Sequence, residues 1–114
     1  MNHKLLSGTL EMMIMEVLSH GPSYGYEITQ TVLNRSAEFF ELKEGSLYPA
    51  LHRLERAGQL ESFWEQADGR RRKYYRLTVA GKQVLEVKRS EWTDFASAVN
   101  GVLGLKSGLL SGEA

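Results

Sequence analysis

The feature that most restricts the possible folds of this chain is a predicted β-hairpin that follows several short helical patterns. Residues 59–66 (QLESFWEQ) alternate polar and apolar side chains and include aromatics, as a half-buried strand does. Asp68-Gly69 is a dipeptide that favours a tight hairpin turn. Residues 71–77 (RRKYYRL) then return as a second strand. In a chain of 114 residues without repeats, the other segments are expected to pack around this hairpin as one unit.

The segments before the hairpin have helical periodicity. Residues 10–20 carry an apolar stripe at positions i, i+3, i+4, i+7 and i+8, which predicts an amphipathic helix. Ser23 is a suitable N-cap for a second helix over 24–34. A third helix is predicted over 46–57, and a short extended piece over 39–42 separates it from the second. Two short helices joined in this way are typical of a helix-turn-helix.

A long helix is predicted over 79–103, with Thr78 as its N-cap. The predicted fold class is therefore mainly α with a β-hairpin wing, that is, a winged helix-turn-helix followed by one long C-terminal helix. We expect residues 1–78 to form the winged-helix domain and 79–104 to form a dimerisation helix. Residues 105–114 are rich in Gly and Ser and are expected to be a disordered tail.

Composition excludes several classes of function. The chain has no cysteine, so disulfides and thiolate metal sites are absent, and its three histidines lack metal-ligand spacing. No glycine-rich phosphate loop or nucleophile motif is present, so we expect neither an enzyme nor a cofactor. No apolar run is long enough to span a membrane. Glu11 and Glu16 interrupt any signal-peptide core, so the expected location is cytoplasmic.

Charge is unevenly distributed although the net charge is zero. Residues 43–82 carry nine basic and five acidic side chains, and the basic residues 70–73 and Arg76 are opposed locally by Asp68 alone. Such a local basic block favours an anionic partner such as double-stranded DNA. A solvated turn rich in Lys and Arg is the simpler alternative.

The third helix and the hairpin tip are the candidate DNA-binding elements. One face of the helix is apolar, and the other would present side chains to DNA, with Ser46, Tyr48 or His52 reading base edges. The DNA-facing candidates on this helix are Ser46, Tyr48, Pro49, His52 and Arg53. The candidates on the wing are Gly69, Arg70, Arg71 and Lys73. The alternatives are an ordinary amphipathic helix and a charged edge that prevents aggregation.

The last helix carries a heptad-like stripe. Leu85, Trp92 and Val99 are spaced by seven, and Phe95 and Val102 follow by three, as in a coiled coil. This pattern predicts a homodimer in which the stripes of two copies meet. Alternatively, the helix folds back on its own domain. Trp92 beside the flexible Met12 and Met15 either packs at this interface or lines an adaptable apolar pocket.

Three segments together resemble the PadR family of bacterial transcriptional regulators. They are LLSGTLEMMIMEVLSHGPSYGYEI, LKEGSLYPALHRLERAGQLES and GRRRKYYRLTVAGK, and they cover about residues 5–82. The single C-terminal helix makes the chain similar to the short branch of that family, which includes multidrug-sensing members. The resemblance implies a homodimeric repressor that binds a palindromic operator and is released by a small planar aromatic ligand.

The resemblance also implies roles for individual residues. Those matched to DNA contact are Tyr24, Gly25, Ser46, Leu47, Tyr48, Pro49, Arg53 and the wing from Gly69 to Lys73. Those matched to the effector pocket are Trp92, which would stack the ligand, and Leu5, Glu11, Met12, Met15, Phe95 and Ala96. The rival hypothesis is a winged helix that binds only proteins, which the zero net charge favours.

Overall fold

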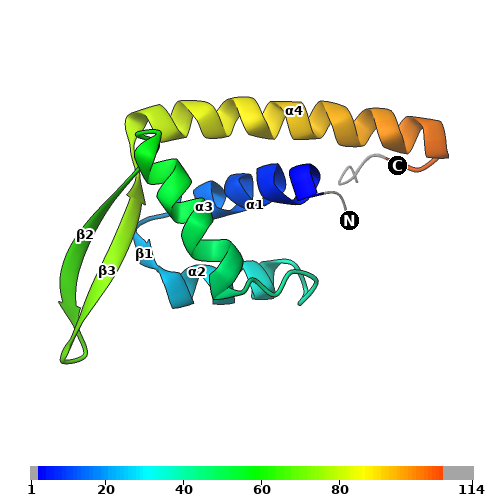
Figure 1. Ribbon diagram of the computed structural model, residues 1–114. Coiled ribbons are helices and arrows are strands. Elements are labelled where there is room, and N and C mark those ends of the chain that lie inside the picture. The colour runs from blue at the N-terminus through cyan, green and yellow to red at the C-terminus, as the bar shows by residue number, and fades with distance from the viewer. Residues whose placement is uncertain (1–2, 107–114) are drawn as a thin grey trace.

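The computed structural model describes residues 3–106, with side chains from residue 8 onward, and its secondary structure follows the predicted order. The fold class is confirmed: helices and a small antiparallel sheet form a winged helix-turn-helix with one long C-terminal helix (Figure 1). The elements are α1 (His3–Leu18), β1 (Ser23–Tyr24), α2 (Gly25–Arg35), α3 (Glu44–Arg56), β2 (Leu60–Ala67), β3 (Arg70–Leu77) and α4 (Val79–Leu103).

The β2–β3 hairpin forms where the sequence predicts it. The strands pair antiparallel from Leu60↔Leu77 to Ala67↔Arg70. The two turn residues both have positive φ, 53° at Asp68 and 73° at the following glycine. A tight turn of this kind needs left-handed backbone at both positions, which Asp and Gly tolerate better than most residues.

A third strand, β1, was not predicted. It contains only two residues and pairs antiparallel with β3, which gives the sheet order β1-β3-β2. Ser23 therefore lies in a strand, and Tyr24 rather than Ser23 is the N-cap of α2. The extended piece predicted over 39–42 does not become a strand. A two-residue strand has no periodicity to detect, because its pairing depends on a partner far away in sequence.

Helix α1 lies at the centre of the fold, with α4 along one side and α2 and α3 on others (Figure 1). This position explains why its apolar residues are not confined to one stripe. Met15, expected at a pocket, is instead fully buried in the core. The buried core residues are Leu10, Ile14, Met15, Val17, Leu18, Ile28, Val32, Leu47, Ala50, Leu51, Leu54, Leu60, Tyr75, Leu77 and Leu85.

Helix α4 begins where the sequence predicts. The Thr78 Oγ1 accepts a hydrogen bond of 3.0 Å from the Gly81 backbone N–H, and the helix is followed by its C-cap Gly104, which has a left-handed φ of 77°. Its first turns pack on the winged helix, and its far half extends past the other elements (Figure 1). No helix within the described residues is both long and apolar enough to cross a membrane.

Candidate nucleic-acid interface

The outer face of α3 presents the polar side chains that the sequence singles out. Ser46, Tyr48, Pro49 and His52 are all exposed on this helix, and Arg53 is 43% exposed. They share the side opposite the buried leucines, as helical periodicity requires. Because α3 starts at Glu44, two residues earlier than predicted, these side chains occupy its first three turns.

Leu47 does not belong to this surface. It was matched to DNA contact, but its side chain is almost completely buried in the core. Its neighbours in the sequence, Ser46 and Tyr48, are exposed. Consecutive helical positions differ by about 100°, so the burial of Leu47 is what allows its neighbours to face outward. We therefore assign Leu47 to packing.

Gly25, at the start of α2, permits the close approach of α2 to α3. A Cβ atom at this position would collide with the hydroxyl group of Tyr48 and come within 3.0 Å of its ring carbon Cζ. The tyrosine ring thus covers the first turn of α2. The sequence match placed Gly25 near DNA phosphate, and the structure adds a packing reason for glycine there.

The hairpin divides its cations between two faces. Side chains alternate along β3, so Arg71 and Lys73 share the face of the buried Tyr75, and Arg70 and Arg72 lie on the other. The Tyr75 face is turned to α3, since Ser62, paired with Tyr75, donates a 2.6 Å hydrogen bond to a carboxylate of α3. Two of the predicted wing cations, Arg71 and Lys73, therefore lie on the face of the hairpin that is turned to α3.

Aromatic rings hold several of these cations in place. The Arg71 guanidinium lies 4.7 Å from the Trp64 ring centroid, and the Lys73 ammonium lies 5.6 Å from that of Tyr75. These contacts limit the positions that the long side chains adopt. A basic tip with restricted side chains has less entropy to lose when it meets a phosphate.

Arg72 lies within the wing segment matched to DNA contact but was not among the cations chosen from the strand pattern, and it has a distinct role in the fold. Its Nη1 donates a 3.1 Å hydrogen bond to the Tyr24 hydroxyl, and its guanidinium stacks 4.5 Å from the Tyr24 ring centroid. Tyr24 also packs edge-on against Tyr74, with ring centroids 5.4 Å apart. These contacts join the wing to the start of α2. The alternation of β3 places Arg72 on the Tyr74 face, but only the unpredicted β1 brings Tyr24 there.

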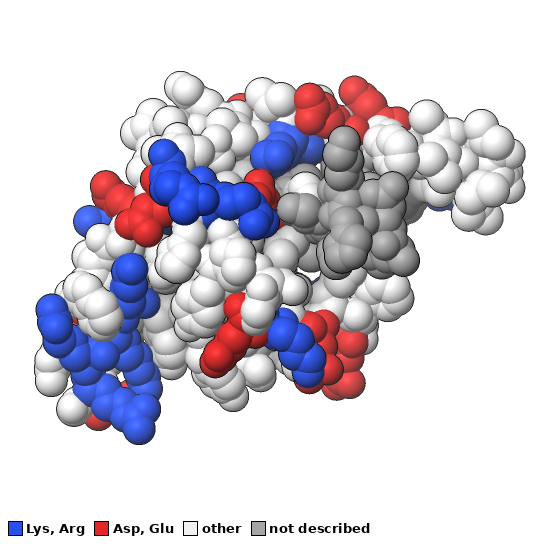
Figure 2. All heavy atoms as spheres, viewed as in Figure 1, with Lys and Arg blue, Asp and Glu red and all other residues white. Residues whose placement is uncertain are grey.

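Lys and Arg side chains gather in two separate groups on the face shown in Figure 2. Figure 2 shows Lys and Arg side chains gathered over the β2–β3 hairpin, with a second group over α3. Acidic side chains lie between and beside these groups. The zero net charge of the chain therefore conceals a local basic surface, which is the distribution that a DNA-binding module needs.

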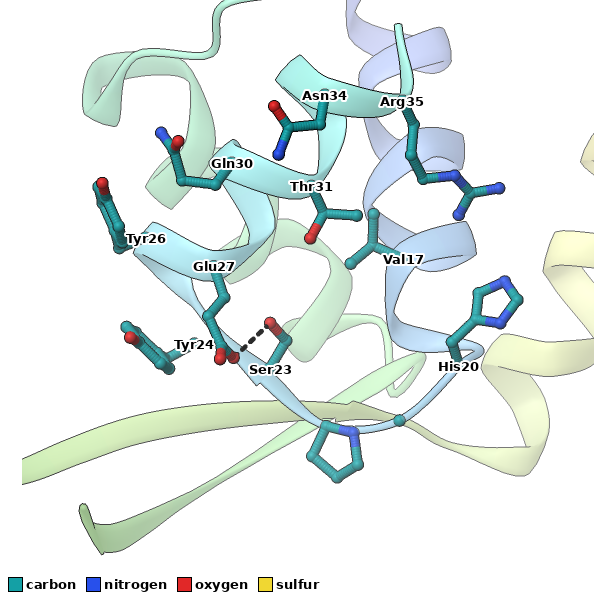
Figure 3. A pocket seen from close by; sticks show the side chains of 12 residues that line it. Val17, His20, Ser23, Tyr24, Tyr26, Glu27, Gln30, Thr31, Asn34 and Arg35 are labelled. Carbon is teal, nitrogen blue, oxygen red and sulfur yellow. Dashed lines mark hydrogen bonds between the residues drawn. The ribbon is translucent and has the colours of Figure 1, made fainter. Parts of the chain in front are cut away.

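A cavity of about 430 Å³ lies along α2, between this helix and the end of α1 (Figure 3). Its wall includes Ser23, whose Oγ donates a 3.0 Å hydrogen bond to Glu27 Oε1. Glu27 and Arg35 give it charges of both signs, and it is open to solvent. Among the described residues, no group of His, Asp or Glu could hold a metal ion. We assign this cavity no chemistry.

A second groove, of about 230 Å³, lies between α1 and α4. Met12, Trp92 and Phe95 line it together with Lys88 and Glu91, and the ring centroids of Trp92 and Phe95 are 6.0 Å apart. The structure thus brings together three of the residues matched to an effector pocket. The other four residues matched to this pocket do not line the groove. Met15 is buried in the core, and Glu11 forms an ion pair with α3. Ala96 is half-buried outside the groove, and the side chain of Leu5 lies outside the described residues.

The heptad-like series on α4 begins in the core and ends in solvent. Leu85, expected at a dimer interface, is only 5% exposed because it packs inside its own chain. Trp92 and Val99, seven and fourteen residues later, are exposed, as are Phe95, which is 53% exposed, and Val102. The exposed part of the stripe is thus confined to the second half of α4. Leu85 is a core residue in this structure.

Comparisons with known proteins agree with this architecture. The model of the PadR-like family of transcriptional regulators matches residues 14–87. A transcriptional regulator of Mycobacterium tuberculosis is 36% identical over 90 residues, which is 76% of this chain and 81% of that protein. A PadR family transcription regulator from Clostridium difficile is 39% identical with a TM-score of 0.71, covering 82% of this chain and 96% of its own. A PadR-like transcriptional regulator from Bacillus cereus is 31% identical with a TM-score of 0.78, covering 90% and 99%.

Proposed function

The chain belongs to the PadR-like family of transcriptional regulators, and from this membership we propose that it is a homodimeric repressor released from its operator by a small planar aromatic ligand. Membership makes the chain a DNA-binding regulator and not an enzyme. The dimer, the repressing role, the effector and a cytoplasmic location are the proposed parts.

The observation that carries the DNA-binding mode is the shared orientation of α3 and the wing. Ser46, Tyr48 and His52 project from the exposed face of α3, and Arg71 and Lys73 lie on the side of the hairpin turned to α3. We propose that α3 enters the major groove, where these polar groups read base edges. The wing cations then contact the flanking phosphates or minor groove.

Contacts that position the protein without reading sequence complete this surface. Arg70 and Gly69 lie at the exposed hairpin tip, where a phosphate can approach the backbone. Tyr24 and Gly25 lie at the start of α2, and the N-terminus of a helix attracts a phosphate. Pro49 and Arg53 flank the base-reading residues on α3. Arg53 also forms an ion pair with Glu11 of α1.

The proposed dimer uses the exposed half of α4. Trp92, Phe95, Val99 and Val102 leave a row of large apolar side chains in solvent on a single chain. An apolar row of this kind on a long helix is best covered by the same row of a second copy around a two-fold axis. Such a dimer presents two α3 helices to two half-sites, so the operator is expected to be palindromic.

The proposed effector site is the groove of Met12, Trp92 and Phe95. It lies beside the exposed apolar row, so a second copy would enclose it. A flat aromatic ligand would stack on Trp92, with Met12 adapting to its shape. Binding there would favour one spacing of the two DNA-binding heads over another, which would release the operator.

A gel shift tests the DNA-binding role. Purified protein is mixed at physiological salt with the DNA upstream of its own gene and an excess of unrelated duplex. A shift that resists the competitor is the expected result. If none appears, selection from random duplexes at the same salt provides a second test. Failure to enrich any sequence there would contradict sequence-specific binding.

Fluorescence tests the effector site. Planar aromatic dyes are expected to quench the emission of Trp92 and to release operator DNA over the same concentration range. The chain has two tryptophans, so replacing Trp92 with Phe leaves Trp64 on the wing as an internal reference. Quenching that persists in the Trp92→Phe variant would contradict the proposed site.

A further inference from the structure

Two ion pairs connect α1 to the helices on either side of it. The Nε of Arg53 on α3 donates to Glu11 Oε2 at 2.7 Å, and Nη1 of Arg89 on α4 donates to Glu16 Oε1 at 2.6 Å. The two carboxylates are five residues apart on the same helix and point to different neighbours. Only the first pair reaches an element that faces DNA in the proposed function.

The environment of Glu11 differs from the one its sequence match implied. Its side chain is 18% exposed, and it faces α3 and not the groove beside Trp92. The residue next to it, Met12, lines that groove. Glu11 is therefore a largely covered carboxylate that forms an ion pair with Arg53 of α3.

The contact constrains Arg53 in two ways. The hydrogen bond that Nε donates fixes the plane and direction of the guanidinium, because that group is rigid and its donors form a fork. The negative charge of Glu11 also reduces the attraction of Arg53 for any other anion nearby. An unpaired arginine at the same position would extend toward the phosphates of every DNA sequence alike.

We propose that Glu11 is a positioning residue for operator recognition. By holding Arg53 in one orientation, Glu11 lets it contact DNA only where the operator presents an acceptor in that direction, and weakens its contact with other DNA. Glu11 then contributes to the ratio of operator binding to non-specific binding. This inference rests on the proposed function of α3.

The test compares DNA binding by Glu11→Gln and the wild type over a range of salt concentrations. The probes are an operator from the random-duplex selection and an unrelated duplex of equal length. The variant lacks the negative charge that weakens the attraction of Arg53 for phosphates, so binding to the unrelated duplex should tighten. For that duplex, the slope of log K against log salt concentration should become steeper by about one. The operator-to-unrelated ratio should fall roughly tenfold.

Glu16→Gln is the matched control. It removes the same charge from the same helix and breaks an equivalent ion pair, with Arg89 of α4. In Glu16→Gln, the ratio of operator binding to unrelated-duplex binding should stay within about twofold of the wild-type ratio. An equal fall in both variants, or none in Glu11→Gln, would overturn the inference, because general electrostatics would then explain the result.

A double-mutant cycle tests whether Glu11 acts on DNA binding through Arg53. In an Arg53→Gln background, Glu11→Gln should change neither the ratio nor the salt dependence. A persisting effect would show that Glu11 acts other than through Arg53. If Glu11→Gln does not fold, Glu11→Asp, which withdraws the carboxylate by one methylene, should lower the ratio in the same direction. A wild-type protein that selects no operator contradicts the proposed function itself, before any variant is compared.

Discussion

The hydroxyl group of Tyr24 accepts a 3.1 Å hydrogen bond from Arg72 Nη1, and this contact joins residues 48 positions apart in the chain. Tyr24 lies at the start of α2, and Arg72 lies on the wing. The angle between the helix-turn-helix and the wing therefore depends on a side-chain contact as well as on the two-residue pairing of β1 with β3.

Tyr24→Phe should loosen the wing without removing a phosphate contact. The ring stacking on Arg72 is retained, but the hydrogen bond is lost, at a cost of about 1 kcal/mol of unfolding free energy. Operator affinity should fall while the slope of log K against log salt stays at its wild-type value. Tyr26→Phe, which alters an exposed tyrosine two residues away, is the control. A reduced slope would mean that Tyr24 contacts DNA phosphate directly.

Replacing Arg70 and Arg71 with Ala should weaken binding to all DNA sequences. If both cations contact phosphates, the salt dependence of log K should flatten by about two. The measurement is a titration of operator and unrelated duplex at several salt concentrations. Arg76→Ala serves as a comparison, because Arg76 donates a 2.6 Å hydrogen bond to Glu61 and lies nearer the base of the hairpin. An unchanged slope in the double variant would remove the wing from the binding mode.

Gly81→Ala should destabilise the fold where α4 meets the hairpin. The added Cβ would collide with the backbone carbonyl of Gln59 and the side chain of Leu77, and backbone does not move aside easily. We expect a loss of about 2 kcal/mol in thermal or urea unfolding. Gly101→Ala, in the same helix with no atom within 4 Å of the new Cβ, should gain about 0.5 kcal/mol. Equal effects at both positions would contradict the packing explanation.

Val99→Lys should convert the proposed dimer into a monomer. Val99 lies in the exposed apolar row of α4, and two lysines meeting near a two-fold axis would repel each other and lose apolar contact. Light scattering after size-exclusion chromatography measures the mass directly. Ser90→Lys, on the opposite side of α4 by helical periodicity, should leave the mass unchanged. A dimer that survives Val99→Lys would place the interface elsewhere.

Alkaline pH should destabilise the protein through Tyr75. Burial, with the nearby Glu55 carboxylate and Tyr48, raises the pKa of Tyr75 above its ordinary value of 10.0. Because the folded pKa is the higher one, this contribution to stability is fully present below pH 10.0 and is lost as pH rises through the folded pKa. Urea unfolding between pH 9 and pH 11 should therefore show less loss in Tyr75→Phe than in wild type. Equal losses would assign the alkaline effect to other groups.

Local features allowed the sequence to predict most elements. The Asp68-Gly69 turn and the start of α4 at Thr78 depend on backbone preferences of neighbouring residues, so a short stretch of sequence contains the needed information. The same holds for the exposed face of α3, because the burial of its leucines leaves the intervening polar residues outside. These features predicted the winged helix and the exposed polar face of α3.

The helical pattern of α3 places Leu47 on the apolar face of that helix, whereas the family match assigned it to DNA contact, and its burial agrees with the pattern. The roles of Met15 and Leu85 could not be predicted in this way, because each is apolar and either packing or contact fits its sequence position. All three are buried in the core. Whether each side chain is buried depends on which neighbouring element covers it, and that is a property of the assembled fold.

The sequence alone determined the order of helices and strands, the hairpin turn and the concentration of cations on the wing, because each follows from short-range preferences and side-chain type. Only the tertiary structure decided that Arg72 binds Tyr24 and that Glu11 holds Arg53. Both contacts join residues more than 40 positions apart. Such pairs form only after packing fixes the relative positions of helices and strands, because the distance between donor and acceptor must be correct to within a few tenths of an ångström.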